Sequence, residues 1–181
     1  ALVDPLTAIT ERVESAGGEV VFANGADLDQ AASVASGADI ALVFGHIRMG
    51  EFSDIADIRL DLNGDALVEV VSAAAQRTVV VLNAGTAVEM PWIDDVDAVL
   101  QGWYGGEQFG SALAGILFGD VNPSGKLPMS FPKSLADTPT STPQQYPGIF
   151  SDGTTANRIG DTTFYSDGST CSQIGDSTIC N

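Results

Sequence analysis

The sequence predicts an α/β fold: a mostly parallel sheet with helices on both faces, followed by an irregular proline-rich stretch and a short β-repeat tail. Short apolar runs alternate with segments of helical spacing, which is the pattern of β-α-β units. The clearest run, residues 78–83 (TVVVLN), is almost wholly apolar, as in strands buried on both faces. At 181 residues and 44% hydrophobic content, the chain is long enough to bury a sizeable core.

Capping residues and glycines mark the ends of the expected helices. Asp4 is placed to cap the first helix, and Gly17 with Gly18 to end it, while Gly37 and Gly119 end two others. The expected helices cover residues 5–16, 27–36, 64–75 and 107–118. The expected strands cover residues 19–23, 38–44, 78–83 and 97–101.

The composition changes after residue 119. Six of the eight prolines lie between Pro123 and Pro147, so this stretch is expected to be extended and irregular. Residues 151–165 and 166–180 then repeat with a period of 15 and eight identical positions, rich in turn and strand residues. We expect one domain over residues 1–150 and a tail of two hairpin-like repeats over residues 151–181.

The tail repeats contain recurring aspartates and both cysteines. Calcium binding is one interpretation of the aspartates, but their spacing matches no known calcium loop, so plain turns are favoured. The cysteines are compatible with a local disulfide or with two free thiols. No C-x-x-C or His/Cys cluster occurs, so neither a zinc site nor a cofactor is expected. The residues in question are Asp152, Asp161, Asp167, Asp176, Cys171 and Cys180.

The formal net charge of −17 argues against nucleic acid and anionic membranes as partners, because both would need a basic surface. No apolar run approaches the roughly 20 residues of a membrane span. Residues 1–4 lack the charged and apolar regions of a signal peptide, although a mature chain would lack them too.

One loop offers the residue types of an active site. Residues 45–54 (GHIRMGEFSD) follow the apolar run 40–44, and loops at the carboxyl ends of such strands carry functional groups in α/β sheets. A carboxyl such as Glu51, held among these neighbours, can be tuned as a proton donor. Hydrolysis of a glycoside takes two carboxyls, and no convincing second one is visible. The loop is therefore predicted to supply one of the two carboxyls of an active site.

Other candidate residues have simpler interpretations. His46 is the only histidine and no G-x-S-x-G motif occurs, so a hydrolase triad is disfavoured. Trp92, Trp103 and Tyr104 are candidates to stack on a sugar ring, but core or domain-interface packing is favoured over stacking. Of these rings, Trp103 and Tyr104 are favoured over Trp92 to line a cleft. Glu89 and Glu107 are expected to have structural roles. The glycines before Glu107 lack the G-K-[ST] of a phosphate loop, so nucleotide binding is rejected.

Three further motifs occur in a fixed order: NAGTAVEMPW at residues 83–92, QGWYGGEQFG at residues 101–110 and LFGDVNPSGKLP at residues 117–128. Together they resemble the C-terminal α/β sandwich domain of family 3 glycoside hydrolases, which include β-glucosidases and exo-acting β-glucanases. The resemblance covers roughly residues 1–150. The tail repeat is not part of this pattern.

The resemblance implies a division of labour between two domains. In the family, a barrel domain carries the aspartate nucleophile, and the C-terminal domain lends a glutamate as general acid/base. Glu51 occupies the corresponding place. His46 and Arg48 are then expected to contact sugar hydroxyls or to orient Glu51, and Asp54 belongs to the polar part of the same loop. Asp57 and Arg59 follow in that loop, and Trp103 is expected to line the cleft.

The implied function is removal, with retention, of terminal β-D-glucosyl residues from β-glucans or cello-oligosaccharides. The expected partners are the substrate and a barrel domain, which this sequence lacks along with the usual first strand of the C-terminal domain. An exposed barrel-facing surface predicts a homo-oligomer, and the expected location is extracellular or periplasmic. Two alternatives remain: a non-catalytic carbohydrate-binding or interaction module, and a carboxyl pair within the chain made of Glu51 with Asp54 or Asp57.

Overall fold

A computed structural model describes residues 2–51, 55–138, 156–159, 162–165, 169–174 and 177–180. Its contacts divide the chain into two compact units, Ala1–Leu135 and Ala136–Asn181. Each unit is described by itself. The expected boundary near residue 150 lies outside the described residues and stays a prediction.

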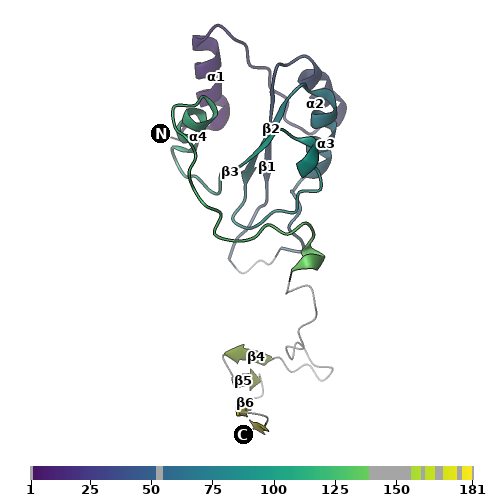
Figure 1. Ribbon diagram of the computed structural model, residues 1–181, viewed down its shortest axis with the longest axis vertical. Coiled ribbons are helices and arrows are strands. Elements are labelled where there is room, and N and C mark those ends of the chain that lie inside the picture. Colours follow the sequence, from purple (N-terminus) through teal and green to yellow (C-terminus); the bar gives the residue numbers. More distant parts are fainter. Residues whose placement is uncertain are drawn as a thin grey trace. The chain divides into compact units, whose positions relative to one another are not determined.

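The first unit is built on a three-stranded parallel sheet. Its strands are β1 (Ala41–His46), β2 (Thr78–Asn83) and β3 (Ala98–Gln101), in the order β1-β2-β3. Because all three strands are parallel, their carboxyl ends, and the loops that follow them, lie at the same end of the sheet (Figure 1).

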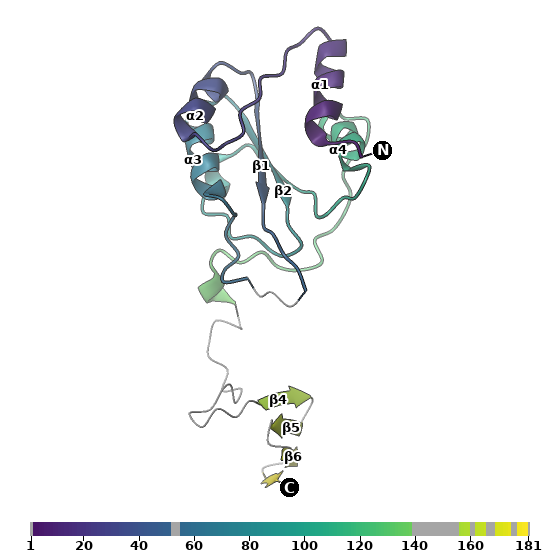
Figure 2. The ribbon, with the colours of Figure 1, turned by 180° about the vertical axis from the view of Figure 1, so that it is seen from behind.

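Helices cover both faces of this sheet, which confirms the predicted fold class. Helices α1 (Pro5–Ser15) and α4 (Phe109–Leu117) pack together on one face. Helices α2 (Leu28–Ser36) and α3 (Gly64–Ala74) pack together on the other, as Figures 1 and 2 show from opposite sides. A short 3-10 turn, η1 (Ile93–Asp95), also belongs to this unit, and a second one, η2 (Leu135–Asp137), begins at its last residue.

The predicted capping residues act as expected. The Asp4 carboxylate accepts the Thr7 backbone N–H at 3.0 Å at the start of α1. Asp27 does the same for Gln30 at the start of α2, also at 3.0 Å. Each contact satisfies a backbone donor that the first helical turn leaves free.

Three of the expected elements differ from the structure by two residues or more. Residues 19–23 form no strand, because their backbone joins no ladder of hydrogen bonds. The strand expected over residues 38–44 begins at Ala41 and continues to His46, so His46 ends a strand and does not lie in the loop. The last helix begins at Phe109, two residues later than expected.

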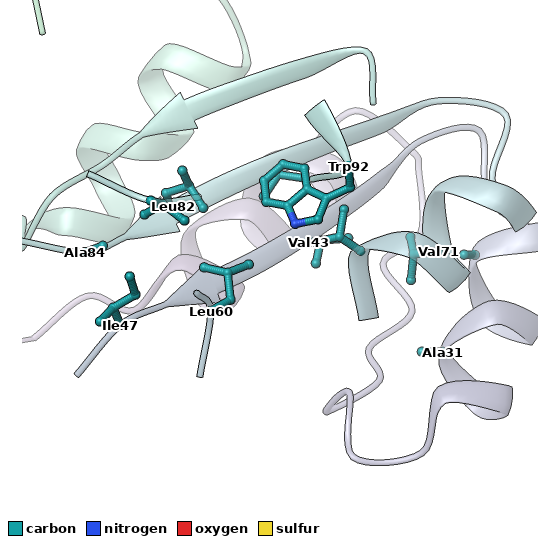
Figure 3. Close-up of a cluster of buried hydrophobic side chains, with 12 residues drawn as sticks. Ala31, Val43, Ile47, Leu60, Val71, Leu82, Ala84 and Trp92 are labelled. Carbon is teal, nitrogen blue, oxygen red and sulfur yellow. The ribbon is translucent and has the colours of Figure 1, made fainter. Parts of the chain in front are cut away.

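The core lies mainly between the sheet and the α2–α3 layer. Trp92 is fully buried, as expected, and Figure 3 shows its ring close to Val43 and Leu82. Val68 of α3 and Val80 of β2 are also fully buried. Ile47, immediately after β1, is only 2% exposed, so the core extends to the root of the candidate loop.

The second unit contains a four-stranded antiparallel sheet, β4 (Ala156–Ile159), β5 (Thr162–Tyr165), β6 (Thr170–Ile174) and β7 (Ser177–Cys180). Each sequence repeat contributes one pair of neighbouring strands, and β5 also pairs with β6. Cys171 is disulfide-bonded, and the register places it opposite Cys180, the only other cysteine. The four tail aspartates considered for calcium all lie outside the described residues.

Candidate functional site

The loop between β1 and α3 is closed at its base by Asp61. The Asp61 backbone N–H donates to the His46 carbonyl at 2.9 Å. The Asp61 carboxylate in turn accepts the Arg48 backbone N–H at 2.7 Å. These two bonds hold the outgoing and returning ends of the loop together, so the intervening residues project from a fixed base.

Ile47 fixes the same base to the neighbouring strands. Its backbone N–H donates to the Asn83 carbonyl of β2 at 3.3 Å. Its carbonyl accepts the phenolic hydroxyl of Tyr104, which follows β3, at 2.7 Å. Because its side chain is buried as well, Ile47 is held by both its backbone and its side chain, four residues before Glu51.

Glu51 lies at a turn directly after Gly50 and is exposed. Among the described residues, none donates a hydrogen bond to the Glu51 carboxylate or forms an ion pair with it. Phe52, Ser53 and the predicted substrate contact Asp54 lie outside the described residues. The structure therefore offers Glu51 as an accessible carboxylate on a tethered loop.

His46 and Arg48, both predicted to contact sugar, gather around Asp61. The His46 Nε2 atom lies 3.9 Å from the Asp61 carboxylate, with 40% of the His46 side chain exposed. The exposed Arg48 borders a hollow of about 270 Å³, whose polar lining includes Asp57, Arg59 and Asp61. This hollow is lined by residues of the loop itself and brings cationic and anionic side chains together within it.

The segment after β3 presents Tyr104 to this loop. Trp103 is half-buried and has a left-handed backbone conformation, with φ of 53°. Tyr104 makes the tether to Ile47 and still leaves 54% of its surface exposed. Tyr104 also lines a second hollow of about 280 Å³, together with Asn83, Gly105 and Gly106. Of the two predicted ring candidates, only Tyr104 has a described hydrogen bond to the loop.

A polar network anchors the returning half of the loop to the core. Arg59 Nε donates to Asp65 at 2.7 Å, and the Trp92 indole N–H donates to the other Asp65 oxygen at 2.7 Å. Arg59 also pairs with Glu89 at 3.3 Å. The hydrogen bond that Arg59 donates to Asp65, followed by the negative charge of Asp65, raises the pKa of Arg59. Glu89 is thus held in a structural contact.

The roles of Asp61 and Asp65 were not predicted from the sequence. A buried tryptophan requires an acceptor for its indole N–H, and that rule signals a partner for Trp92 without identifying it. Asp65 is 27 positions away in sequence, so only the fold reveals the pair. Asp61 carried no signal of its own, because an aspartate in a loop usually faces solvent.

The site's chemistry is that of one accessible carboxylate supported by a polar loop. The part of the chain that the structure describes brings together no group of three or more His, Cys, Asp or Glu side chains suited to a metal ion. Within those same residues, every helix falls short of the length and apolar character needed to cross a lipid bilayer.

Comparison with known proteins gives consistent results. The sequence profile of the "Glycosyl hydrolase family 3 C-terminal domain" matches residues 1–172. Beta-glucosidase B of Emericella nidulans is 45% identical over 136 residues, and Beta-glucosidase of Rhizobium radiobacter is 43% identical over 129. These matches cover 72% and 68% of this chain but only 16% of each relative.

A solved structure shares the fold. Beta-D-glucoside glucohydrolase from Trichoderma reesei superposes with a TM-score of 0.72 at 33% sequence identity. The match covers 75% of this chain and 21% of that one. The chain therefore spans about a fifth or less of the length of each of these three proteins.

Proposed function

The chain belongs to glycosyl hydrolase family 3, whose C-terminal domain it matches, and we propose that it forms the part of a β-glucosidase that supplies the general acid/base, Glu51. The observation that carries the proposal is the accessible Glu51 carboxylate on a loop whose base is fixed by Ile47, Arg48 and Asp61. A catalytic acid must be held in a defined position but must reach a group on another molecule or domain.

The proposed reaction is hydrolysis with retention, and it needs a second carboxyl from a barrel domain. In a retaining enzyme the two carboxyls are about 5–5.5 Å apart. The barrel aspartate attacks the anomeric carbon while Glu51 donates a proton to the leaving oxygen. Glu51 then takes a proton from water, which attacks the glucosyl intermediate and releases glucose. Two carboxyls suffice for this chemistry, so it calls for neither metal nor cofactor.

His46, Arg48, Asp54 and Trp103 complete the proposed site as substrate-binding residues. Arg48 and His46 lie at the base of the Glu51 loop, where imidazole and guanidinium N–H groups can donate to sugar hydroxyls. The proposed substrates are β-glucans or cello-oligosaccharides, from which terminal β-D-glucosyl residues are released.

An extracellular or periplasmic location is also proposed. It is supported by the disulfide at Cys171, because such bonds persist mainly in oxidising compartments. Self-association through the surface that would otherwise face the barrel is a further part of the proposal. Monomers at every concentration in a light-scattering series would count against it.

The proposal is tested by placing the chain in a complete enzyme. In a chimera, the C-terminal α/β domain of the Rhizobium radiobacter β-glucosidase is replaced by residues 1–150 of this chain. We expect the chimera to hydrolyse cellobiose, whose alcohol leaving group needs a proton, and Glu51→Gln to lower kcat/KM for cellobiose by roughly 10²–10⁴-fold. The matched control is Glu69→Gln, the same chemical change at an exposed position of α3.

Equal activity of the Glu51→Gln and Glu69→Gln chimeras would refute the assignment of Glu51. If instead this chain alone bound glucan without hydrolysing it, and Glu51→Gln left that binding unchanged, the carbohydrate-binding module would be the better account.

A further inference from the structure

Tyr104 reaches from the segment after β3 to the segment after β1, across the end of β2. The strand order is β1-β2-β3, so β1 and β3 are not neighbours and lie about 10 Å apart in the sheet. The phenolic O–H of Tyr104 nevertheless donates to the Ile47 carbonyl at 2.7 Å, although the two residues are 57 positions apart. Ile47 is the first residue after β1, so this side chain joins the Glu51 loop to a strand that is not its neighbour.

The path of the Tyr104 side chain depends on the absence of a side chain at Gly85, just beyond β2. A β-carbon at Gly85 would lie 2.8 Å from Tyr104 Cε2 and 3.4 Å from the sulfur of Met49, which belongs to the Glu51 loop. Carbon atoms in contact are normally 3.5–4.0 Å apart. A methyl group at position 85 would therefore push the tyrosine ring away from its present place.

The backbone just before Tyr104 is held in an uncommon conformation. Trp103 has φ of 53°, in the left-handed region that a bulky residue rarely adopts. The preceding Gly102 N–H donates to the Leu82 carbonyl of β2 at 2.8 Å, and a β-carbon at Gly102 would lie 2.8 Å from the Phe109 ring. Strained residues of this kind persist where their surroundings hold them, and they cluster at functional sites. The turn gives the side chain of Tyr104 a fixed starting point.

We infer that Tyr104 is a positioning residue for the general acid/base: its hydroxyl holds the Ile47 carbonyl and thereby restricts where the loop presents Glu51. The inference rests on the proposed function of Glu51, and it gives Tyr104 no contact with the substrate. A displacement of about 1 Å at a reacting group can cost roughly 10²-fold in rate. A hydrogen bond four residues before Glu51 can therefore affect the reaction without touching the sugar.

Amide hydrogen exchange tests the tether on the purified chain. Tyr104→Phe keeps the ring but removes the hydroxyl. The Ile47 amide donates to β2 and the Arg48 amide donates to Asp61, so both report on the base of the loop. We expect these two amides to exchange about fivefold faster in Tyr104→Phe. Val80, fully buried in β2, should keep its rate, because its exchange follows the stability of the whole domain.

Kinetics of the chimera test the consequence for catalysis. With phenyl β-glucoside, whose leaving group needs a proton, Tyr104→Phe should lower kcat/KM about tenfold. With dinitrophenyl β-glucoside, whose leaving group departs without a proton, the loss should be less than about twofold. When Glu51→Gln is already present, adding Tyr104→Phe should lower kcat/KM for phenyl β-glucoside by less than about twofold, because the hydroxyl acts through Glu51.

A substitution at Gly85 gives an independent variant. Gly85→Ala keeps the tyrosine hydroxyl but displaces the ring, so it should reproduce the faster exchange and the dependence on the leaving group. The matched control is Gly115→Ala, the same chemical change where the new methyl group would be 4.0 Å from the nearest atom outside its own turn. This control should exchange and react as the unchanged protein does.

Unchanged exchange at Ile47 and Arg48 in Tyr104→Phe, or equal acceleration at Val80, would overturn the tether. An equal loss with both glucosides, or a full tenfold loss on top of Glu51→Gln, would overturn the positioning role. A Glu51→Gln chimera as active as its parent would refute the proposed function itself, and the inference with it. If circular dichroism shows that Tyr104→Phe does not fold, the same measurements on Gly85→Ala decide the matter.

Discussion

Asp65 connects the candidate loop to the core through both of its carboxylate oxygens. One oxygen accepts from Arg59 and the other from the indole N–H of Trp92, each at 2.7 Å. The Asp65 side chain is only 12% exposed, so both partners compensate for the removal of a charge from water. At the scale of single residues, the returning half of the loop is thus anchored through Asp65 and its two hydrogen-bond donors, Arg59 and Trp92.

Trp92→Phe tests that dependence. The substitution removes the indole N–H and leaves one Asp65 oxygen buried without its partner, and it also opens space in the core. We expect the free energy of unfolding to fall by roughly 2–4 kcal/mol, measured by urea denaturation followed by circular dichroism. Trp103→Phe, at a half-buried position, should cost less than about 1 kcal/mol. Equal losses would show that Asp65 does not need the indole.

Asp120 gives a pH-dependent prediction. Two hydrogen bonds from Arg12, at 2.6 and 3.0 Å, lower the pKa of Asp120 below its ordinary value of 3.8, and the charge of Arg12 acts in the same direction. Because the folded pKa is the lower one, the contact stabilises the fold above pH 3.8, and this stabilisation is lost as the pH falls through the folded pKa. Asp120→Asn should therefore lower Tm at neutral pH.

In strong acid the two proteins should converge in Tm. Thermal unfolding followed at a series of pH values measures this directly. Because both side chains are about half exposed, the effect is expected to be small and to weaken in high salt. A Tm difference that persisted unchanged in strong acid would contradict the role assigned to the ion pair.

At the scale of elements, α4 is fixed against the segment that leads into α1. The Gly110 N–H donates to the Val3 carbonyl at 3.0 Å. A β-carbon at Gly110 would lie 2.4 Å from the Asp4 carbonyl oxygen, which is backbone and cannot rotate away. This close approach, together with the packing of α1 on α4, forms the second helical layer of the sheet.

Two glycine substitutions within α4 separate this packing from helix propensity. Gly110→Ala should destabilise the domain by about 2 kcal/mol or more, because the new methyl group forces two backbone segments apart. Gly115→Ala should be neutral or stabilise by up to about 1 kcal/mol, since its methyl group would be 4.0 Å from the nearest atom outside its own turn. Urea denaturation of both variants measures the two free energies of unfolding. Similar changes in the two variants would contradict the role assigned to the close approach at Gly110.

At the scale of the whole molecule, local signals predicted most of the elements. Asp4 and Asp27 cap their helices as the sequence indicated, and residues 78–83 form β2 with the predicted bounds. Residues 19–23 have the composition of a strand but form none, because a strand is defined by a neighbour and not by its own residues. The bonds of Asp61 and Asp65 were not predictable for the same reason, since their partners are brought close only by the fold.

The candidate site follows the same division. The sequence alone drew attention to the loop of Glu51, and the structure adds what holds it: the bonds of Asp61, the tether from Tyr104 and the anchor at Asp65.

We expect the isolated chain to be inactive. With only one of two carboxyls, purified residues 1–181 should release no para-nitrophenol from para-nitrophenyl β-glucoside above the buffer rate. Turnover that disappears in both Glu51→Gln and Asp57→Asn would instead reveal a carboxyl pair within the chain. Continuous absorbance at high protein concentration is the appropriate assay.

The most direct test of the central claim is the dependence of the chimeric enzyme on its leaving group. Phenol is a poor leaving group and needs a proton, whereas dinitrophenolate departs without one. If Glu51 is the acid, Glu51→Gln should lower kcat/KM for phenyl β-glucoside by roughly 10²-fold or more. For dinitrophenyl β-glucoside, the same substitution should lower kcat/KM by less than about tenfold. An equal loss with both substrates would mean that Glu51 acts only in folding or binding, and the claim would fail.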